Sequence, residues 1–226
     1  MLVIEGCICG DGVNAGDVNI IALDQEWELG RELADAIRQQ APVIDDVLVQ
    51  EYVTRMGSRI VEVTERNDVP WTFHLVADTS INAFNIPGGH VFVNTGLIAA
   101  AETPDELAGV LSHEIAHGVA RHATEQMTEA YGLNLLARLI LGGDVGLLEQ
   151  IAAQLVGTGT MAKFSRDDER ESDRLGLSFM SDAGYDPNAM ATMFERMLAI
   201  RVRRPSMLEQ FFSTHPLTEE RIDDVS

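Results

Sequence analysis

Apolar residues recur at intervals of three and four over much of the chain, which is the pattern of amphipathic helices. The pattern predicts a helix over residues 24–37, ended by Pro42, and a second helix over about 45–66. Two short stretches, 71–77 and 91–94, alternate large apolar residues with others and predict strands. Between them the sequence Ile-Pro-Gly-Gly at 86–89 predicts a tight turn.

The second half of the chain is predicted to be helical. Thr103, Pro104 and Glu106 form a helix-start signature, with Thr103 as the N-cap and Glu106 reaching back to it, and the helix should run past Gly118. Residues 124–162 are apolar but interrupted by glycines, and further helices are expected over about 165–184 and 187–203. The sequence therefore predicts an α+β domain over 24–226, mainly helical with a small mixed sheet, after a flexible segment over 1–23.

The charge balance narrows the possible partners. The 226 residues include 16 Lys and Arg against 36 Asp and Glu, for a net charge of −20. A chain this acidic repels phosphate backbones and anionic headgroups, so no nucleic-acid partner is expected. No stretch approaches the run of about 18 apolar residues that a transmembrane helix needs, so no transmembrane segment is expected.

The N-terminal residues contain both cysteines of the chain, Cys7 and Cys9, in a glycine-rich stretch. They predict a leader remnant or flexible tail; lipid attachment at Cys7 and a surface redox pair are the alternatives. Two thiols are too few for a four-ligand structural zinc site, and no secretory signal is visible before them.

The chemistry is concentrated in the sequence His-Glu-Ile-Ala-His at 113–117. Residues four apart on a helix share a face, so His113 and His117 can both reach one metal ion. Glu114 can then reach a water bound to that ion, which is the arrangement of zinc hydrolases. The alternative is a solvated face of histidine and glutamate.

A catalytic zinc site needs a third protein ligand. The metzincin pattern would place a histidine at 123 and a glycine at 120, but both residues are alanine, which excludes that class. His122 lies about 140° around the helix from the ligand face, which favours a surface or packing role. Glu169 and Asp173 are four apart on the helix predicted after Ser165, so one can bind zinc while the other orients a ligand histidine. Glu171 does not lie on the helix face that Glu169 and Asp173 share.

Together these motifs resemble the HtpX and CAAX prenyl protease family of zinc metallopeptidases, which is marked by HExxH followed by ExxxD. The chain is most similar to the bacterial periplasmic branch that lacks membrane helices. The resemblance covers about residues 24–223 and includes the segments 28–30, 82–84, 88–91, 94–98, 105–108, 113–117, 165–169, 173–174 and 214–217.

The resemblance implies a zincin-like fold, one Zn²⁺ ion, and a role for each site residue. His113, His117 and Glu169 would bind the zinc, Glu114 would be the general base, and Asp173 would orient a ligand histidine.

The resemblance also implies a substrate-binding edge strand beside the cleft. Asn82, Gly89, His90 and Val91 would belong to this turn and strand, where a substrate adds itself in extended form. By local sequence alone, His90 is a solvent-facing strand residue.

His215 has two interpretations. Locally it is a loop histidine before Pro216, but in the branch that the chain resembles, the matching histidine approaches the zinc. As a fourth ligand it would displace the catalytic water and keep the enzyme latent. The glycine-interrupted segment 124–162 is either a lid over the cleft or a helical hairpin that completes the core.

The expected function is a metalloendopeptidase that cleaves unfolded or misassembled proteins of the bacterial envelope, in the periplasm or lipid-anchored. The location and the envelope partners follow from the resemblance alone. A chaperone-like module with a capped or structural zinc, and a hydrolase of non-peptide amides, are the alternatives. Arg174 and Tyr185 are candidates for stabilising the oxyanion.

Overall fold

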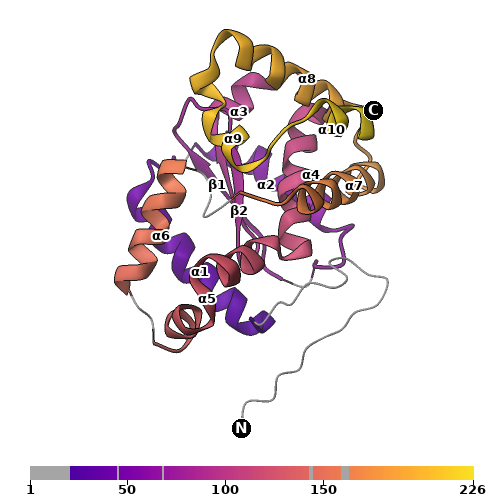
Figure 1. Ribbon diagram of the computed structural model, residues 1–226. Helices are drawn as coiled ribbons and strands as arrows, with labels where there is room; N and C mark the ends of the chain where they lie inside the picture. Colours follow the sequence, from indigo (N-terminus) through magenta and orange to yellow (C-terminus); the bar gives the residue numbers. More distant parts are fainter. Residues whose placement is uncertain (1–20, 45, 68, 143–144, 159–162) are drawn as a thin grey trace.

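The computed structural model describes residues 21–44, 46–67, 69–142, 145–158 and 163–226 (Figure 1). Most of the predicted flexible segment, including Cys7 and Cys9, lies outside the described residues. The strands are β1 (Thr72–Val76), β2 (Ala83–Ile86) and β3 (His90–Asn94). The helices are α1 (Leu23–Gln40), α2 (Val47–Val61), α3 (Thr95–Ala100), α4 (Pro104–Ala120), α5 (His122–Gly142), α6 (Val145–Thr158), α7 (Arg166–Asp182), α8 (Asn188–Arg203), α9 (Glu209–Thr214) and α10 (Glu219–Asp224), with a 3₁₀ turn η1 (Pro205–Met207) before α9. The predicted α+β class, mainly helical with a small mixed sheet, is confirmed.

The sheet formed by the described residues has the strand order β1-β3-β2. β3 runs parallel to β1 and antiparallel to β2. β2 and β3 are joined through the predicted turn, in which Gly88 and Gly89 have φ of 81° and 78°, a region that residues with a side chain rarely adopt.

The strand order corrects the predicted edge strand. β3 is the middle strand, so the prediction that His90 and Val91 belong to an edge strand is wrong, and Gly89 lies in the turn. Asn82 comes directly before β2, which is an edge strand of this sheet. The prediction that His90 faces solvent is also wrong: its side chain is buried, and Nδ1 lies 2.6 Å from Oγ1 of Thr72. Burial lowers the pKa of His90 to about 4.

Helices cover both faces of the sheet, and Figure 1 shows α1, α5 and α6 on one side of the strands. That side packs around Leu33, Ile37 and Phe92. On the other side, α2, α4 and α8 pack against Phe73, Leu75 and Val93 of the sheet. These helices contribute Ile60, Leu111 and Phe194, respectively. The alternation of β1 therefore sends successive side chains into two different apolar layers.

The segment predicted as a lid or hairpin forms α5 and α6. Leu148, Ile151 and Leu155 of α6 share an apolar cluster with Leu33 and Ile37 of α1. These contacts agree with the hairpin interpretation, in which the segment completes the core on one side of the sheet.

The start of α4 is capped nearly as predicted. Thr103 Oγ1 accepts a hydrogen bond from the backbone N–H of Glu106 at 3.2 Å, and Pro104 occupies the first turn. The prediction that Glu106 reaches back to Thr103 is wrong by one residue, because its Oε2 accepts from the backbone N–H of Glu102 at 2.6 Å.

α4 lies close to β2 because of Gly118. A Cβ atom at Gly118 would stand 2.6 Å from the ring of Trp71 and 2.9 Å from the side-chain amide of Asn85. Close packing here places the last two turns of α4, which carry the His-Glu motif, beside the edge strand.

Candidate metal centre

α4 brings the three residues of the His-Glu motif together inside the protein. His113 and His117 are 0% exposed and Glu114 is 1% exposed. The Nε2 atoms of the two histidines lie 3.1 Å apart, as expected for residues that share one helix face. Buried polar side chains need partners, so the surroundings of these three residues decide what the site can do.

α7 supplies the carboxylates. Oε2 of Glu169 lies 3.7 Å from Nε2 of His113, and Oε1 lies 3.6 Å from Nε2 of His117. Asp173, one turn later, places Oδ1 at 3.0 Å from Nδ1 of His113. Glu169 therefore faces the atoms that would bind a metal, whereas Asp173 lies behind one of the histidines.

His215 completes the cluster from the loop after α9. Its Nδ1 lies 2.8 Å from Oε1 of Glu169 and 3.4 Å from Nε2 of His113. Nε2 on the other side of the ring lies 3.5 Å from Oε1 of Glu114. The two carboxylates raise the pKa of His215 although burial opposes them.

These distances fit a tetrahedral zinc site. Potential ligand atoms of His113, His117, Glu169 and His215 all lie within 4.8 Å of one another. Zinc–ligand bonds of about 2.0–2.1 Å put the corners of a tetrahedron about 3.3–3.4 Å apart, which is close to the observed spacing. The donor set of imidazoles and one carboxylate is also typical of catalytic zinc.

Glu114 provides an independent test of this fit. Both of its side-chain oxygens are buried. Burial raises the pKa of Glu114, although His215 and His113 oppose the shift. A buried carboxylate whose nearest charged neighbour, Nε2 of His215, lies as far as 3.5 Å is costly unless a further group, such as a metal-bound water, completes its environment. The residues present therefore fit a zinc ion with a water beside Glu114.

Arg221 of α10 is part of the site, although no motif around it in the sequence predicted this. Nε and Nη2 donate to the two oxygens of Asp173 at 2.6 Å and 2.7 Å, and Nη1 donates to Glu169 and, at 3.1 Å, to the carbonyl of Pro216. Burial would raise the pKa of Asp173, but hydrogen bonds from His113 and Arg221 hold it below its ordinary value. Arg221 thus helps to lower the pKa of Asp173 and also contacts the second buried carboxylate, that of Glu169.

His122 also lies beside the site, although helix phase predicted a position away from the ligand face, and Glu171 reaches the site only through His122. His122 is 1% exposed, and its Nδ1 lies 2.9 Å from Nδ1 of His117. Its Nε2 lies 3.2 Å from Oε2 of Glu171. The prediction failed because α4 ends at Ala120, and the helix phase does not extend to residue 122.

The two candidates for the oxyanion lie elsewhere. The side chain of Arg174 is 76% exposed and lies 3.8 Å from Glu171. The ring of Tyr185 packs under the guanidinium of Arg59 at 5.1 Å, on the side of α2. Neither residue contacts the four side chains of the metal cluster among the contacts of the described residues, so the structure supports neither candidate.

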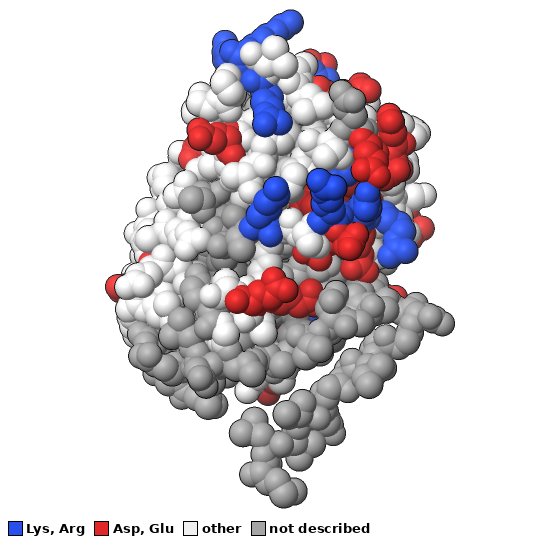
Figure 2. Space-filling model, viewed as in Figure 1, with Lys and Arg blue, Asp and Glu red and all other residues white. Residues whose placement is uncertain are grey.

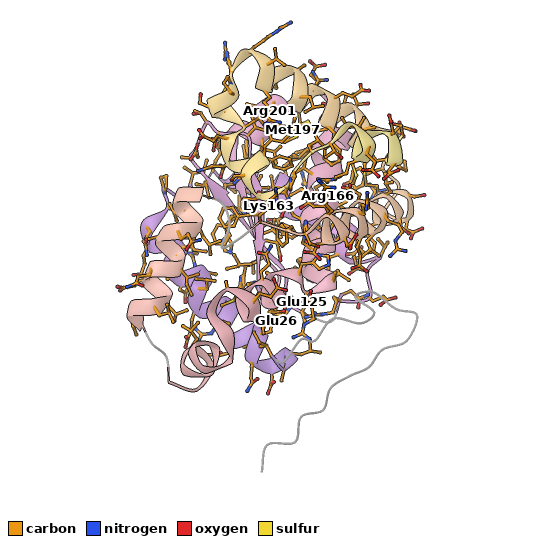
Figure 3. The ribbon with its side chains drawn as sticks, in the orientation of Figure 1. Glu26, Glu125, Lys163, Arg166, Met197 and Arg201 are labelled. Atoms are coloured by element: carbon orange, nitrogen blue, oxygen red, sulfur yellow. The ribbon has the colours of Figure 1, made fainter. Side chains whose placement is uncertain are left out.

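Phe164 closes the site from outside. Its ring stacks on His117 at 3.9 Å between centroids and on His215 at 5.1 Å. Its backbone N–H donates to the carbonyl of Thr214 at 3.2 Å, which joins this segment to the loop that carries His215. Figure 3 labels the neighbouring Lys163 and Arg166 where the chain enters α7. The ring of Phe164 and the buried ligands give a closed site.

The charges around the site are mixed in sign. On the face in Figure 2, basic and acidic side chains lie next to one another on the side where α7 runs. Arg170 of α7, for example, pairs with Glu220 at 2.7 Å. The excess of negative charge therefore does not form a uniform acidic surface on this face.

The geometry of two histidines, a helix-borne carboxylate and a nearby glutamate agrees with the comparison to known proteins. The sequence profile of Peptidase family M48 matches residues 48–226. The chain belongs to Peptidase family M48. The recognition of a zinc metallopeptidase family from the sequence motifs is thus confirmed.

Named members of family M48 are similar over most of the chain. The putative beta-barrel assembly-enhancing protease of Vibrio cholerae is 35% identical over 95% of this chain and 47% of its own length. The beta-barrel assembly-enhancing protease of Escherichia coli K12 is 32% identical over 94% of this chain and 45% of its own length. The mitochondrial metalloendopeptidase OMA1 of Schizosaccharomyces pombe is 39% identical over 76% of this chain and 50% of its own length. The chain thus spans about half the length of these relatives.

None of the helices in the described part of the chain is both long enough and apolar enough to span a membrane.

Proposed function

We propose that this chain is a zinc-dependent metalloendopeptidase domain that hydrolyses peptide bonds of unfolded or misassembled envelope proteins. The observation that carries the proposal is the buried set of His113, His117 and Glu169 with the buried carboxylate of Glu114 beside it. The substrate class rests on the names of the M48 relatives, two of which refer to β-barrel assembly.

Each residue of the site has a chemical task in this proposal. Zinc held by the three ligands would supply a water of pKa about 7 and would polarise the scissile carbonyl. Burial lowers the pKa of His117 far below its ordinary value, which keeps the imidazole neutral and its lone pair available as a ligand. Glu114 accepts the proton of the attacking water on a carboxylate oxygen and passes it to the leaving amine. The raised pKa of Glu114 suits both steps, because the group must bind and then release a proton.

Removal of the metal tests this function. Dialysis against a chelator is expected to reduce cleavage of unfolded casein to background, and about one equivalent of Zn²⁺ per chain should restore it, because the water and the polarised carbonyl both depend on the metal. Cleavage is followed as the release of fluorescent peptides. Cleavage that persists in the zinc-free protein would contradict the proposal.

We further propose that His215 is a fourth ligand that holds the enzyme latent. Its ring nitrogen lies among the other ligand atoms, and His215 is only 1% exposed. A fourth protein ligand occupies the position that a catalytic zinc reserves for water. Because Phe164 stacks on the same ring, movement of the loop after α9 would uncover the metal and the substrate path together.

Replacing His215 by Ala is expected to raise casein cleavage about tenfold, on the assumption that the capped form outnumbers the open form by about ten to one. The variant removes the capping imidazole but leaves His113, His117 and Glu169 in place. The rate is measured at full zinc occupancy. The matched control is His74→Ala, because His74 lies on β1 and is not among the residues of the metal cluster. Unchanged or lower activity of the His215 variant would argue against latency.

The edge of β2 is the proposed position of the substrate. α4 packs against β2, and Asn82 lies directly before the strand, so an extended peptide paired with β2 would run past the His-Glu motif. Gly89, His90 and Val91 are not part of this proposed surface, because they lie in the turn and on the middle strand.

A chaperone-like module with a capped zinc is the second candidate function. The observation in its favour is the four-residue ligand set, because structural zinc sites have four protein ligands. In that case Glu114 would have no catalytic task, and replacing it would leave the function of the protein unchanged.

The proposed location is the bacterial periplasm or a lipid-anchored position in the envelope, with envelope proteins as partners. The names of the bacterial relatives support an envelope function. Lipid attachment at Cys7 is one proposed means of anchoring, and Cys7 lies outside the described residues.

A further inference from the structure

We propose that His122 and Glu171 form a positioning pair that orients the metal ligand His117. The three side chains lie in a row, with the imidazole of His122 between the other two. This inference rests on the metal site of the proposed function and adds two residues that set the direction of one ligand.

The contacts of His122 occupy both nitrogens of its ring. Nδ1 lies 2.9 Å from Nδ1 of His117 and 3.4 Å from Oγ of Ser172, and Nε2 lies 3.2 Å from Oε2 of Glu171. The side chain of His122 is 1% exposed and that of Glu171 is 18% exposed. The row therefore runs from the buried metal ligand to a carboxylate near the surface.

The two ends of this row, the carboxylate of Glu171 and the proposed metal ligand His117, set the direction of the hydrogen bonds. A carboxylate only accepts, so Nε2–H of His122 donates to Glu171. A metal ion bound to Nε2 of His117 requires the hydrogen of that ring on Nδ1, and Nδ1 of His122 lies 2.9 Å away, in position to accept it. With its hydrogen on Nδ1, His117 presents the lone pair of Nε2 to the metal site. The pair thus selects the tautomer that a metal requires.

The backbone after α4 brings His122 into this position. Arg121 has a φ of 65°, the left-handed conformation, and it is the only residue other than glycine with positive φ among the described residues. The regular helix is interrupted there, so His122 does not keep the phase of α4, and its ring lies beside that of His117. Arg121 is fixed by its Nε, which donates to Oε2 of Glu26 at 2.5 Å.

Two carboxylates of α7 therefore orient the two histidine ligands in different ways. Asp173 of α7 contacts Nδ1 of His113 directly at 3.0 Å. Glu171, two residues earlier, acts on Nδ1 of His117 through the ring of His122. Loss of an outer partner of a ligand histidine typically weakens metal binding by about 10–100-fold.

Zinc affinity tests this inference without relying on proteolysis. Dissociation constants are measured by competition with a chromophoric chelator for the full chain and for His122→Phe, Glu171→Ala and Glu171→Gln. We expect the first two variants to bind zinc about 10–100-fold more weakly. Glu171→Gln retains an oxygen that can accept the hydrogen bond of His122, so its zinc dissociation constant should stay within about threefold of that of the unmodified chain. If only the negative charge of Glu171 mattered, this variant would lose affinity as Glu171→Ala does.

His74→Phe is the matched control, because His74 is a partly buried histidine of β1 that contacts Thr72 and Phe92 rather than the metal cluster. Its zinc affinity should not change. Thermal unfolding of the zinc-free variants shows whether each chain is folded, and Glu171→Ala alters a side chain near the surface, so it remains a test if His122→Phe does not fold.

Zinc affinity within threefold of the unmodified chain in folded Glu171→Ala and His122→Phe would overturn the inference, as would an equal loss in His74→Phe. If the unmodified chain itself failed to bind zinc, the proposed metal site would be wrong, which is a different outcome.

Discussion

Replacing Glu114 by Gln is expected to reduce casein cleavage by a factor of about 10²–10⁴, which is the usual contribution of a general acid–base group. The amide has almost the same shape as the carboxylate but cannot accept the proton of the attacking water. The amide also keeps an oxygen that can accept from the backbone of Asn85, and the charged neighbour that the substitution affects, Nε2 of His215, lies 3.5 Å from Oε1. The loss should therefore appear in the rate and not in folding.

The control for this variant is its zinc content. His113 and His117 are unchanged, so Glu114→Gln should still bind one Zn²⁺ with an affinity close to that of the unmodified chain. The comparison is repeated with His215→Ala in both chains, so that the proposed cap does not hide the catalytic effect. Equal cleavage by both chains would contradict the catalytic role of Glu114 and favour the chaperone-like alternative.

Replacing Arg221 by Met is expected to lower the free energy of unfolding by about 3–5 kcal/mol, the usual cost of removing one partner of a buried ion pair. Arg221 is 4% exposed, and its guanidinium contacts the carboxylates of both Asp173 and Glu169. Without it these two buried carboxylates lose their common cation. Urea unfolding of the zinc-free protein measures the effect without the contribution of metal binding.

Arg170→Met provides a control on the same pair of helices. Arg170 and Glu220 also join α7 to α10, at 2.7 Å, but their side chains are 43% and 62% exposed. An exposed pair contributes about 0–1 kcal/mol, so this variant should unfold almost like the unmodified chain. Similar losses in both variants would show that burial does not give Arg221 a special role.

The sequence predicted the part of the site that depends on regular helices. His113 and His117, and likewise Glu169 and Asp173, are four apart, and each pair lies on one face of a helix as expected. Turn and cap signals gave the starts of α4 and α7 because those interactions are local. The roles of these residues at a zinc ion remain a proposal that the geometry supports.

The parts that the sequence did not predict depend on chain reversals and on partners far along the chain. His122 was placed by continuing the helix beyond Ala120, but the left-handed conformation of Arg121 ends that regularity. Arg221 is 48 residues from Asp173, and nothing in its local sequence marks a buried cation.

The alternation of apolar and other residues along each strand also did not predict the order of the strands in the sheet. Alternation identifies strands but does not say which of them lies in the middle of a sheet, because pairing is decided between segments that are distant in sequence. For this reason the predicted edge strand included His90 and Val91 of β3, whereas β2 is at the edge.

The most direct test of the metal centre is anomalous X-ray diffraction from crystals of the zinc-loaded chain, recorded on both sides of the zinc absorption edge. We expect one zinc peak about 2.0–2.2 Å from Nε2 of His113, Nε2 of His117 and a carboxylate oxygen of Glu169. A peak bound by other residues, or no zinc peak at these three side chains, would contradict this expectation.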